Sequence, residues 1–174
     1  AKQPVSAGGL GVDCPMTGGT NFSSDDRSDL FLNAHYDYIA RHTYQSHPTT
    51  GTEYQVGTAV SNGNSTLGDV GGNTFAAASF RKLMGLPFIV TESLIAEPNI
   101  HSAEFNLIAS AIYSYQGWSL TAFTYMNKAL DNRTNQITNS FIIMDHPGRF
   151  STITSASLLY HRAEITKAEI GYYR

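Results

Sequence analysis

Charged residues and long apolar runs are both scarce in this sequence. Only 14% of its 174 residues are charged, the formal net charge is −3, and the lysines and arginines are scattered along the chain. The sequence lacks the basic face that nucleic-acid binding uses, so we expect no nucleic-acid partner. Its apolar runs stay below the roughly 20 residues of a membrane-spanning helix, so we expect no membrane partner.

Cysteine is almost absent as well. Cys14 is the only one, which excludes a disulfide within these residues and a cysteine-based metal cluster. Asn, Ser, Thr, Gly and Tyr are common instead, which suits a secreted or cell-surface protein. The sequence opens without a signal-peptide pattern, but a mature secreted protein would also lack one, so the compartment stays open.

One apolar run with a carboxylate behind it dominates the sequence. Leu86–Val90 is short, β-rich and without period-2 alternation, which is typical of a parallel strand buried on both faces. The polar residues Thr91, Glu92 and Ser93 are expected to end it. A carboxylate at the carboxyl end of such a strand lies where α/β enzymes place their chemistry. An ordinary acid that leaves the strand into solvent has about equal weight.

Strands and helices are expected to alternate along the chain. The expected strands are Pro4–Ala7, Tyr36–Tyr44, Leu86–Val90, Trp118–Tyr125 and Ile165–Tyr173. The expected helices are Ser23–Asn33, Thr74–Met84, His101–Gln116 and Phe150–Arg162, with Gly85 and Gly117 as stop signals and an irregular Thr49–Asn73 segment. In the third helix Phe105, Ile108, Ile112 and Tyr115 share one face. This alternation predicts an α/β fold with parallel βαβ units.

The order and spacing of several segments resemble one enzyme family. Pro87–Glu92, followed by Pro98-Asn99, Glu104 and Gln116-Gly117-Trp118, resembles strand units seven and eight of clan A glycoside hydrolases. These are retaining (β/α)8-barrel enzymes, such as the cellulase-like and β-galactosidase-like families. Ile39–Tyr44 with His47-Pro48 resembles their sixth strand, and Asp145–Pro147 with Ala156–Arg162 resembles their last helix.

The resemblance covers about residues 35–174 and implies the C-terminal half, about strands 5–8, of a (β/α)8 TIM barrel. Residues 1–165 would form the half-barrel, with Pro4–Ser6 as the fifth strand. Residues 166–174 would form a closing strand or begin a following β-domain. A whole barrel of this kind takes roughly 250 residues, more than the 174 present. A half-barrel exposes unpaired strand edges, so we expect association with an N-terminal half, in the same or a separate chain, or with another copy.

The resemblance also implies a reaction and its catalytic residue. In these enzymes the glutamate that ends the seventh strand is the nucleophile, and it corresponds to Glu92. Their acid/base is a glutamate, usually after an asparagine, at the end of the fourth strand, and no Asn-Glu dipeptide occurs in this sequence. The implied protein is a cofactor-free retaining hydrolase of O-glycosidic bonds in an oligo- or polysaccharide, with its acid/base on the missing N-terminal half.

Four further residues are candidates for binding the carbohydrate. If the strand of His42 and Tyr44 lies beside that of Glu92, Tyr44 can donate a hydrogen bond to the carboxylate, and His42 to the carboxylate or a sugar hydroxyl. Tyr125 is a candidate for stacking on a pyranose ring, and Asn127 for binding a hydroxyl. A packed histidine or tyrosine and an ordinary turn asparagine are about equally expected at these positions.

Other interpretations remain beside this one. His35, Asp37, His42 and His47 are of metal-binding types, but their spacing fits no compact ligand set, so we expect no metal. Trp118, at the amino end of its strand, is expected in the core. Glu97 and Glu104 are weaker candidates, because one precedes a proline in a loop and the other complements a helix dipole. The alternative function is a non-catalytic carbohydrate-binding or structural relative of the barrel.

Overall fold

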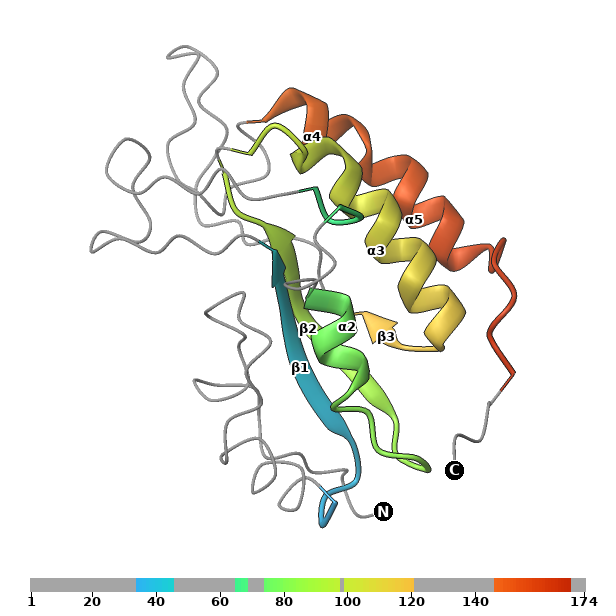
Figure 1. Ribbon diagram of the computed structural model, residues 1–174. Helices are drawn as coiled ribbons and strands as arrows, with labels where there is room; N and C mark the ends of the chain where they lie inside the picture. Colours follow the sequence, from blue (N-terminus) through green and yellow to red (C-terminus); the bar gives the residue numbers. More distant parts are fainter. Residues whose placement is uncertain (1–33, 46–64, 69–73, 98, 121–145, 170–174) are drawn as a thin grey trace, which may run out of the picture.

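The computed structural model describes residues 34–45, 65–68, 74–97, 99–120 and 146–169 (Figure 1). These residues form the strands β1 (Ile39–Gln45), β2 (Phe88–Ile95) and β3 (Ser119–Leu120) and the helices α2 (Thr74–Ser79), α3 (Ser102–Gln116), α4 (Pro147–Ser151) and α5 (Ile153–His161). The strands form one sheet in the order β1-β2-β3, and both pairings are parallel. The predicted α/β class with parallel βαβ units is confirmed.

The central strand is longer than the sequence pattern indicates. β2 runs to Ile95, so the prediction that Thr91, Glu92 and Ser93 end the strand is wrong. The side chains of Leu94 and Ile95 are fully buried beyond these polar residues. The strand continues through these polar residues because their side chains form hydrogen bonds with residues of β1. The apolar residues directly before and after them are buried, which favours a continuous strand.

Helix α3 follows the prediction, with one residue misplaced. It ends at Gly117, whose φ of 64° and ψ of 39° form the left-handed cap that glycine favours. Tyr115 was expected to face inward but is 52% exposed. The buried row instead runs through Phe105, Ala109 and Tyr113, which lie four residues apart and therefore stay on one face of the helix.

The other described helices differ from their expected bounds. α2 stops at Ser79 instead of Met84, and Gly85, with a φ of 85°, then turns the chain into β2. The expected Phe150–Arg162 helix begins earlier and is divided at Thr152 into α4 and α5. His146 caps α4, because its Nδ1 accepts a hydrogen bond from the backbone N–H of Arg149 at 3.1 Å.

Several expected elements lie wholly or partly outside the described residues. These are the first strand, the Ser23–Asn33 helix, most of the Thr49–Asn73 segment and the Trp118–Tyr125 strand beyond Leu120. Residues 165–169 form no strand, and the remainder of the expected Ile165–Tyr173 strand is outside the described range. In the part of the chain that is described, no helix is long and apolar enough to cross a membrane.

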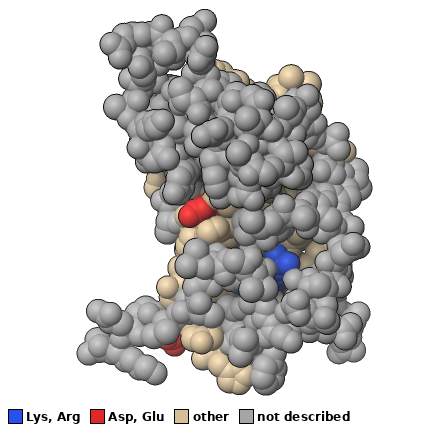
Figure 2. All heavy atoms as spheres, turned by 90° about the vertical axis from the view of Figure 1, so that its left-hand side faces the viewer, with Lys and Arg blue, Asp and Glu red and all other residues tan. Residues whose placement is uncertain are grey.

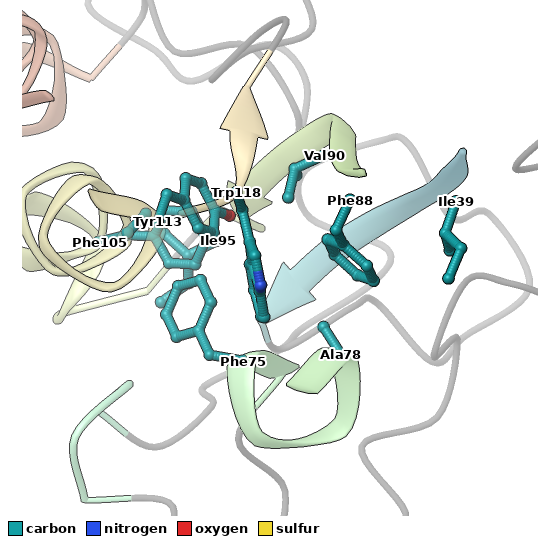
Figure 3. Close-up of a cluster of buried hydrophobic side chains, with 10 residues drawn as sticks. Ile39, Phe75, Ala78, Phe88, Val90, Ile95, Phe105, Tyr113 and Trp118 are labelled. Carbon is teal, nitrogen blue, oxygen red and sulfur yellow. The ribbon is translucent and has the colours of Figure 1, made fainter. Parts of the chain in front are cut away.

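The main core lies between the sheet and helices α2 and α3. Figure 3 shows Trp118 between Phe88 and the side chain of Tyr113, with ring centroids 4.6 and 5.7 Å away. Phe75 of α2 completes this aromatic group, with its ring centroid 5.7 Å from that of Tyr113. Trp118 is only 2% exposed, which confirms its predicted place in the core. Helix α5 packs on the outer side of α3 (Figure 1).

Candidate functional site

The two faces of β1 have different neighbours. Ile39 and Thr43 point toward the helices, where Ile39 joins the main core and Thr43 bonds the hydroxyl of Tyr113 on α3. Because side chains alternate along a strand, His42 and Tyr44 lie on the opposite face. Tyr44 packs there against a second, smaller apolar group that contains Leu94 of β2. We call this face, which lies opposite the main core, the open face of the sheet, although Leu94 on it is fully buried.

Glu92 joins His42 and Tyr44 on the open face. It is the direct partner of His42 in the β1–β2 register, and paired residues of parallel strands project to the same side. The hydroxyl of Tyr44 donates a hydrogen bond to Oε2 of Glu92. Nδ1 of His42 lies 3.5 Å from the same oxygen. The structure thus brings together three of the five site residues predicted from sequence.

This carboxylate is held but still accessible. The Glu92 side chain is 36% exposed, whereas that of His42 is 12% exposed. The rings of His42 and Tyr44 meet edge to face, with centroids 5.8 Å apart, which fixes both donors beside the carboxylate. A carboxylate oriented by a tyrosine hydroxyl and open on one side can serve as a nucleophile, a general base or a hydrogen-bond acceptor for a ligand hydroxyl.

Burial determines the protonation state of His42. Its desolvation lowers the imidazole pKa below the ordinary value of 6.5, while the negative charge of Glu92 opposes this shift more weakly. His42 is therefore neutral at pH 7. A neutral imidazole with its proton on Nδ1 can donate to Glu92 and keep Nε2 as an acceptor.

The stability of the protein should fall as His42 becomes protonated. Its folded-state pKa lies below the unfolded value, so the unfolded state binds more protons once the pH drops below about 6.5. We expect the free energy of unfolding, measured by urea denaturation from pH 7.5 to 5.5, to decrease by at most about 1.4 kcal/mol per pH unit from this group. His42→Asn should flatten that slope, and an unchanged slope would contradict the assignment.

A hydrogen-bonded group of hydroxyls supports the same strand positions from the helix side. Thr43 Oγ1 donates to Ser93 Oγ at 2.9 Å, and the hydroxyl of Tyr113 lies 2.5 Å from both oxygens. All three side chains are fully buried. Burial raises the pKa of Tyr113, so its hydroxyl stays protonated. This group ties β1, β2 and α3 together directly behind Glu92.

The other described carboxylates near this end of β2 are engaged elsewhere. Glu97 is fully buried and pairs with Arg149 of α4, with Oε1 3.4 Å from Nη1. Glu104 accepts hydrogen bonds from the Ser65 hydroxyl at 2.7 Å and from the Thr66 N–H at 2.6 Å. Glu97 differs from its sequence interpretation as a loop acid, whereas Glu104 lies in the first turn of α3 as predicted. Glu97 is a buried ion-pair partner, and Glu104 anchors the 65–68 turn to α3.

The Glu97–Arg149 pair was missed because its two members lie 52 residues apart. The only local signal is a glutamate directly before a proline, which usually marks an exposed loop. Only the packing of α4 against the start of α3 brings a cation to it. Asn106 of α3 strengthens this contact, because its Nδ2 donates to the backbone oxygen of Arg149 at 3.1 Å.

The remaining predicted site residues cannot be placed in this group. Tyr125, Asn127 and His47 lie outside the described residues. Among the residues that are described, no three side chains of metal-binding type gather around a common point. Figure 2 shows the side of the molecule away from α3 and α5, where the charged side chains in colour are few and form no patch of one sign.

Comparisons with protein-family models, with curated proteins and with solved structures each found no match for this chain.

Proposed function

We propose that this chain is the C-terminal half of a retaining glycoside hydrolase barrel and that Glu92 is its nucleophile. The observation that carries the proposal is the contact of Tyr44 and His42 with the exposed carboxylate of Glu92. Both donors were predicted on the condition that their strand lies beside that of Glu92, and β1 and β2 are paired in this way. The substrate class is an oligo- or polysaccharide.

The fold supports the proposal at a coarser level. Barrel strands are parallel, carry helices on one face, and project polar residues from the other near their carboxyl ends. The β1-β2-β3 order, the core between the sheet and helices α2 and α3, and the open face match three successive units of that plan. Under the proposal, β1, β2 and β3 are strands six, seven and eight.

The reaction would proceed in two displacements. An oxygen of Glu92 attacks the anomeric carbon, the glycosidic C–O bond breaks, and the leaving oxygen takes its electron pair and a proton from the acid/base. Water, deprotonated by the same acid/base, then attacks the anomeric carbon and frees Glu92. Tyr44 orients the carboxylate, and His42 donates to it or to a sugar hydroxyl. Tyr125 and Asn127 are proposed to bind the sugar beside them.

The acid/base is proposed to come from outside these 174 residues. A retaining mechanism needs a second carboxyl about 5 to 5.5 Å from the nucleophile. Glu97 and Glu104, the described carboxylates discussed above, are committed to Arg149 and to the 65–68 turn. We therefore propose that an N-terminal half-barrel completes the site, and that this half, or a second copy of this chain, covers the exposed strand edges.

Native mass spectrometry combined with an activity assay tests the proposal. We expect the native protein to bind a second polypeptide of about half-barrel size, or a copy of itself. We also expect the complex to hydrolyse an aryl glycoside with retention, followed by proton NMR of the first-formed sugar. A stable lone 19.0 kDa species without activity would contradict the half-barrel proposal.

The second candidate is a non-catalytic carbohydrate-binding or structural relative. The absence of an Asn-Glu dipeptide from the sequence favours it, because the acid/base of the resembled enzymes usually follows an asparagine. An accessible carboxylate with hydroxyl and imidazole neighbours can also bind sugars without cleaving them. Saturable sugar binding by calorimetry with no turnover, in a sample that contains every strand, would decide for this candidate.

A further inference from the structure

The register of β1 and β2 contains an irregularity next to the candidate nucleophile. Arg41 pairs with Val90, but the next residue, His42, pairs with Glu92, so Thr91 is an extra residue on β2. One extra residue on a strand is a β-bulge, and bulges beside active sites often change the direction of a side chain. The extra residue stands immediately before Glu92.

The bulge reverses the alternation of β2. Before it, the even-numbered residues Phe88 and Val90 lie in the helix-side core. After it, the odd-numbered residues take that side: Ser93 bonds Tyr113 of α3, and Ile95 belongs to the same core. In a regular strand Glu92 would follow Phe88 and Val90, because residues two apart share a face. Its carboxylate would then be directed into the aromatic core.

The side chain of Thr91 contributes to holding the bulge. Its Oγ1 donates a hydrogen bond to the backbone oxygen of Arg41 at 3.3 Å, across the point where the register shifts. A hydroxyl that bonds the neighbouring backbone at this point compensates for the interrupted ladder. Valine has nearly the same shape but cannot make this bond, whereas serine can.

We propose that Thr91 is a positioning residue, whose insertion as a bulge turns Glu92 from the core face to the open face beside His42 and Tyr44. The catalytic meaning of this inference rests on the proposed function. The geometric statement, that accommodating Thr91 as a bulge keeps Glu92 opposite His42, does not. The experiment below therefore measures that contact in the absence of sugar.

The contact can be measured as electrostatic coupling in the full 174-residue chain. The pKa of His42 is followed by NMR titration of its imidazole protons, with Glu92 present and in the Glu92→Gln variant. Since the charge of Glu92 raises the pKa of His42, Glu92→Gln should lower it further. The difference between the two titrations is the coupling.

Three Thr91 variants are compared by this coupling. Deletion of Thr91 should preserve it, because Glu92 then follows Val90 directly, and simple alternation places it on the open face opposite His42. Thr91→Val should reduce it, and Thr91→Ser should restore it toward the original value. Thr154→Val, at an exposed threonine of α5, is the matched control and should leave the coupling unchanged. If the deletion variant does not fold, the valine and serine variants decide.

Two results would overturn the inference. One is a loss of the coupling after deletion of Thr91 in a folded protein. The other, if the deletion does not fold, is an equal coupling in the valine and serine variants. A protein that shows the expected pattern but neither cleaves nor is labelled by glycosides would refute the proposed hydrolase and leave the positioning role intact. The two proposals can thus fail separately.

Discussion

Glu92→Gln should abolish covalent labelling of the chain by 2-deoxy-2-fluoroglycosyl fluorides. In the labelling reaction a Glu92 oxygen bonds to the anomeric carbon, and fluoride leaves with the electron pair of the C–F bond. Fluoride needs no proton to depart, so the first step does not depend on the acid/base. The fluorine at C2 destabilises the oxocarbenium-like transition state of the second step, so the glycosyl ester accumulates.

The amide introduced by Glu92→Gln retains the shape of the side chain and the acceptor for Tyr44 but is a very poor nucleophile. We therefore expect the labelling rate to fall by at least about 10³-fold, as for the loss of other enzymatic nucleophiles. Intact-mass spectrometry over gluco-, galacto-, manno- and xylo-configured probes gives the rate, and peptide mapping locates the adduct. The same variant in the complete protein should lose glycoside hydrolysis to a similar extent.

Glu104→Gln is the control, because its carboxylate bonds the 65–68 turn and not the open face. It should be labelled at the rate of the unaltered chain. An adduct mapped to another residue, or equal labelling of the Glu92→Gln variant, would contradict the nucleophile assignment. So would hydrolysis within a few-fold of the unaltered rate in the complete protein.

Glu97→Ala should cause the largest loss of stability among single changes at the carboxyl end of β2. Both side chains of the Glu97–Arg149 pair are fully buried. Burial already lowers the pKa of Arg149, and the charge of Glu97 is what opposes this shift. Removing the carboxylate leaves a buried cation without its counter-ion, which costs about 3–5 kcal/mol. Urea denaturation at pH 7 should show this loss as a lower midpoint with an unchanged slope.

The double variant Glu97→Leu with Arg149→Met provides the decisive comparison. Because it removes both charges together and fills similar volume, it should be more stable than Glu97→Ala, and can equal the unaltered chain. The change in unfolding free energy of the double variant, minus the sum of the changes for Glu97→Leu and Arg149→Met made singly, measures the coupling of the pair. A Glu97→Ala variant that loses less than about 1 kcal/mol would show that water or another group stabilises Arg149.

Strong local patterns are what made parts of the fold predictable. Phe105 and the apolar residues that follow it at helical spacing, with Gly117 as a left-handed stop, located α3 almost to the residue. The β-rich composition of Tyr36–Tyr44 located β1, although the strand itself begins only at Ile39. Trp118 was assigned to the core for its place at the start of a strand. These features depend on neighbours a few residues away, so periodicity and capping chemistry suffice to find them.

Where the pattern depended on distant partners, prediction failed. Tyr115 has the spacing of a buried residue, but the sheet contacts the row that contains Tyr113. The long carboxyl-terminal helix divides at Thr152, whose hydroxyl bonds the Arg149 backbone oxygen at 2.8 Å and receives Asn106 of α3. Glu97 looked like a loop acid until α4 supplied Arg149.

The sequence by itself determined the α/β class, the positions of β1 and α3, and the choice of Glu92, Tyr44 and His42 as one chemical group. Tertiary structure decided how that group is assembled. An alternating strand would direct Glu92 into the core beside Phe88 and Val90. The bulge at Thr91 directs it to the open face instead. A bulge arises from the pairing of two strands whose facing residues lie some fifty positions apart in the sequence. The cost of interrupting the hydrogen-bond ladder between the strands is offset by the burial of side chains on both faces of the sheet. No local pattern of residues encodes that balance.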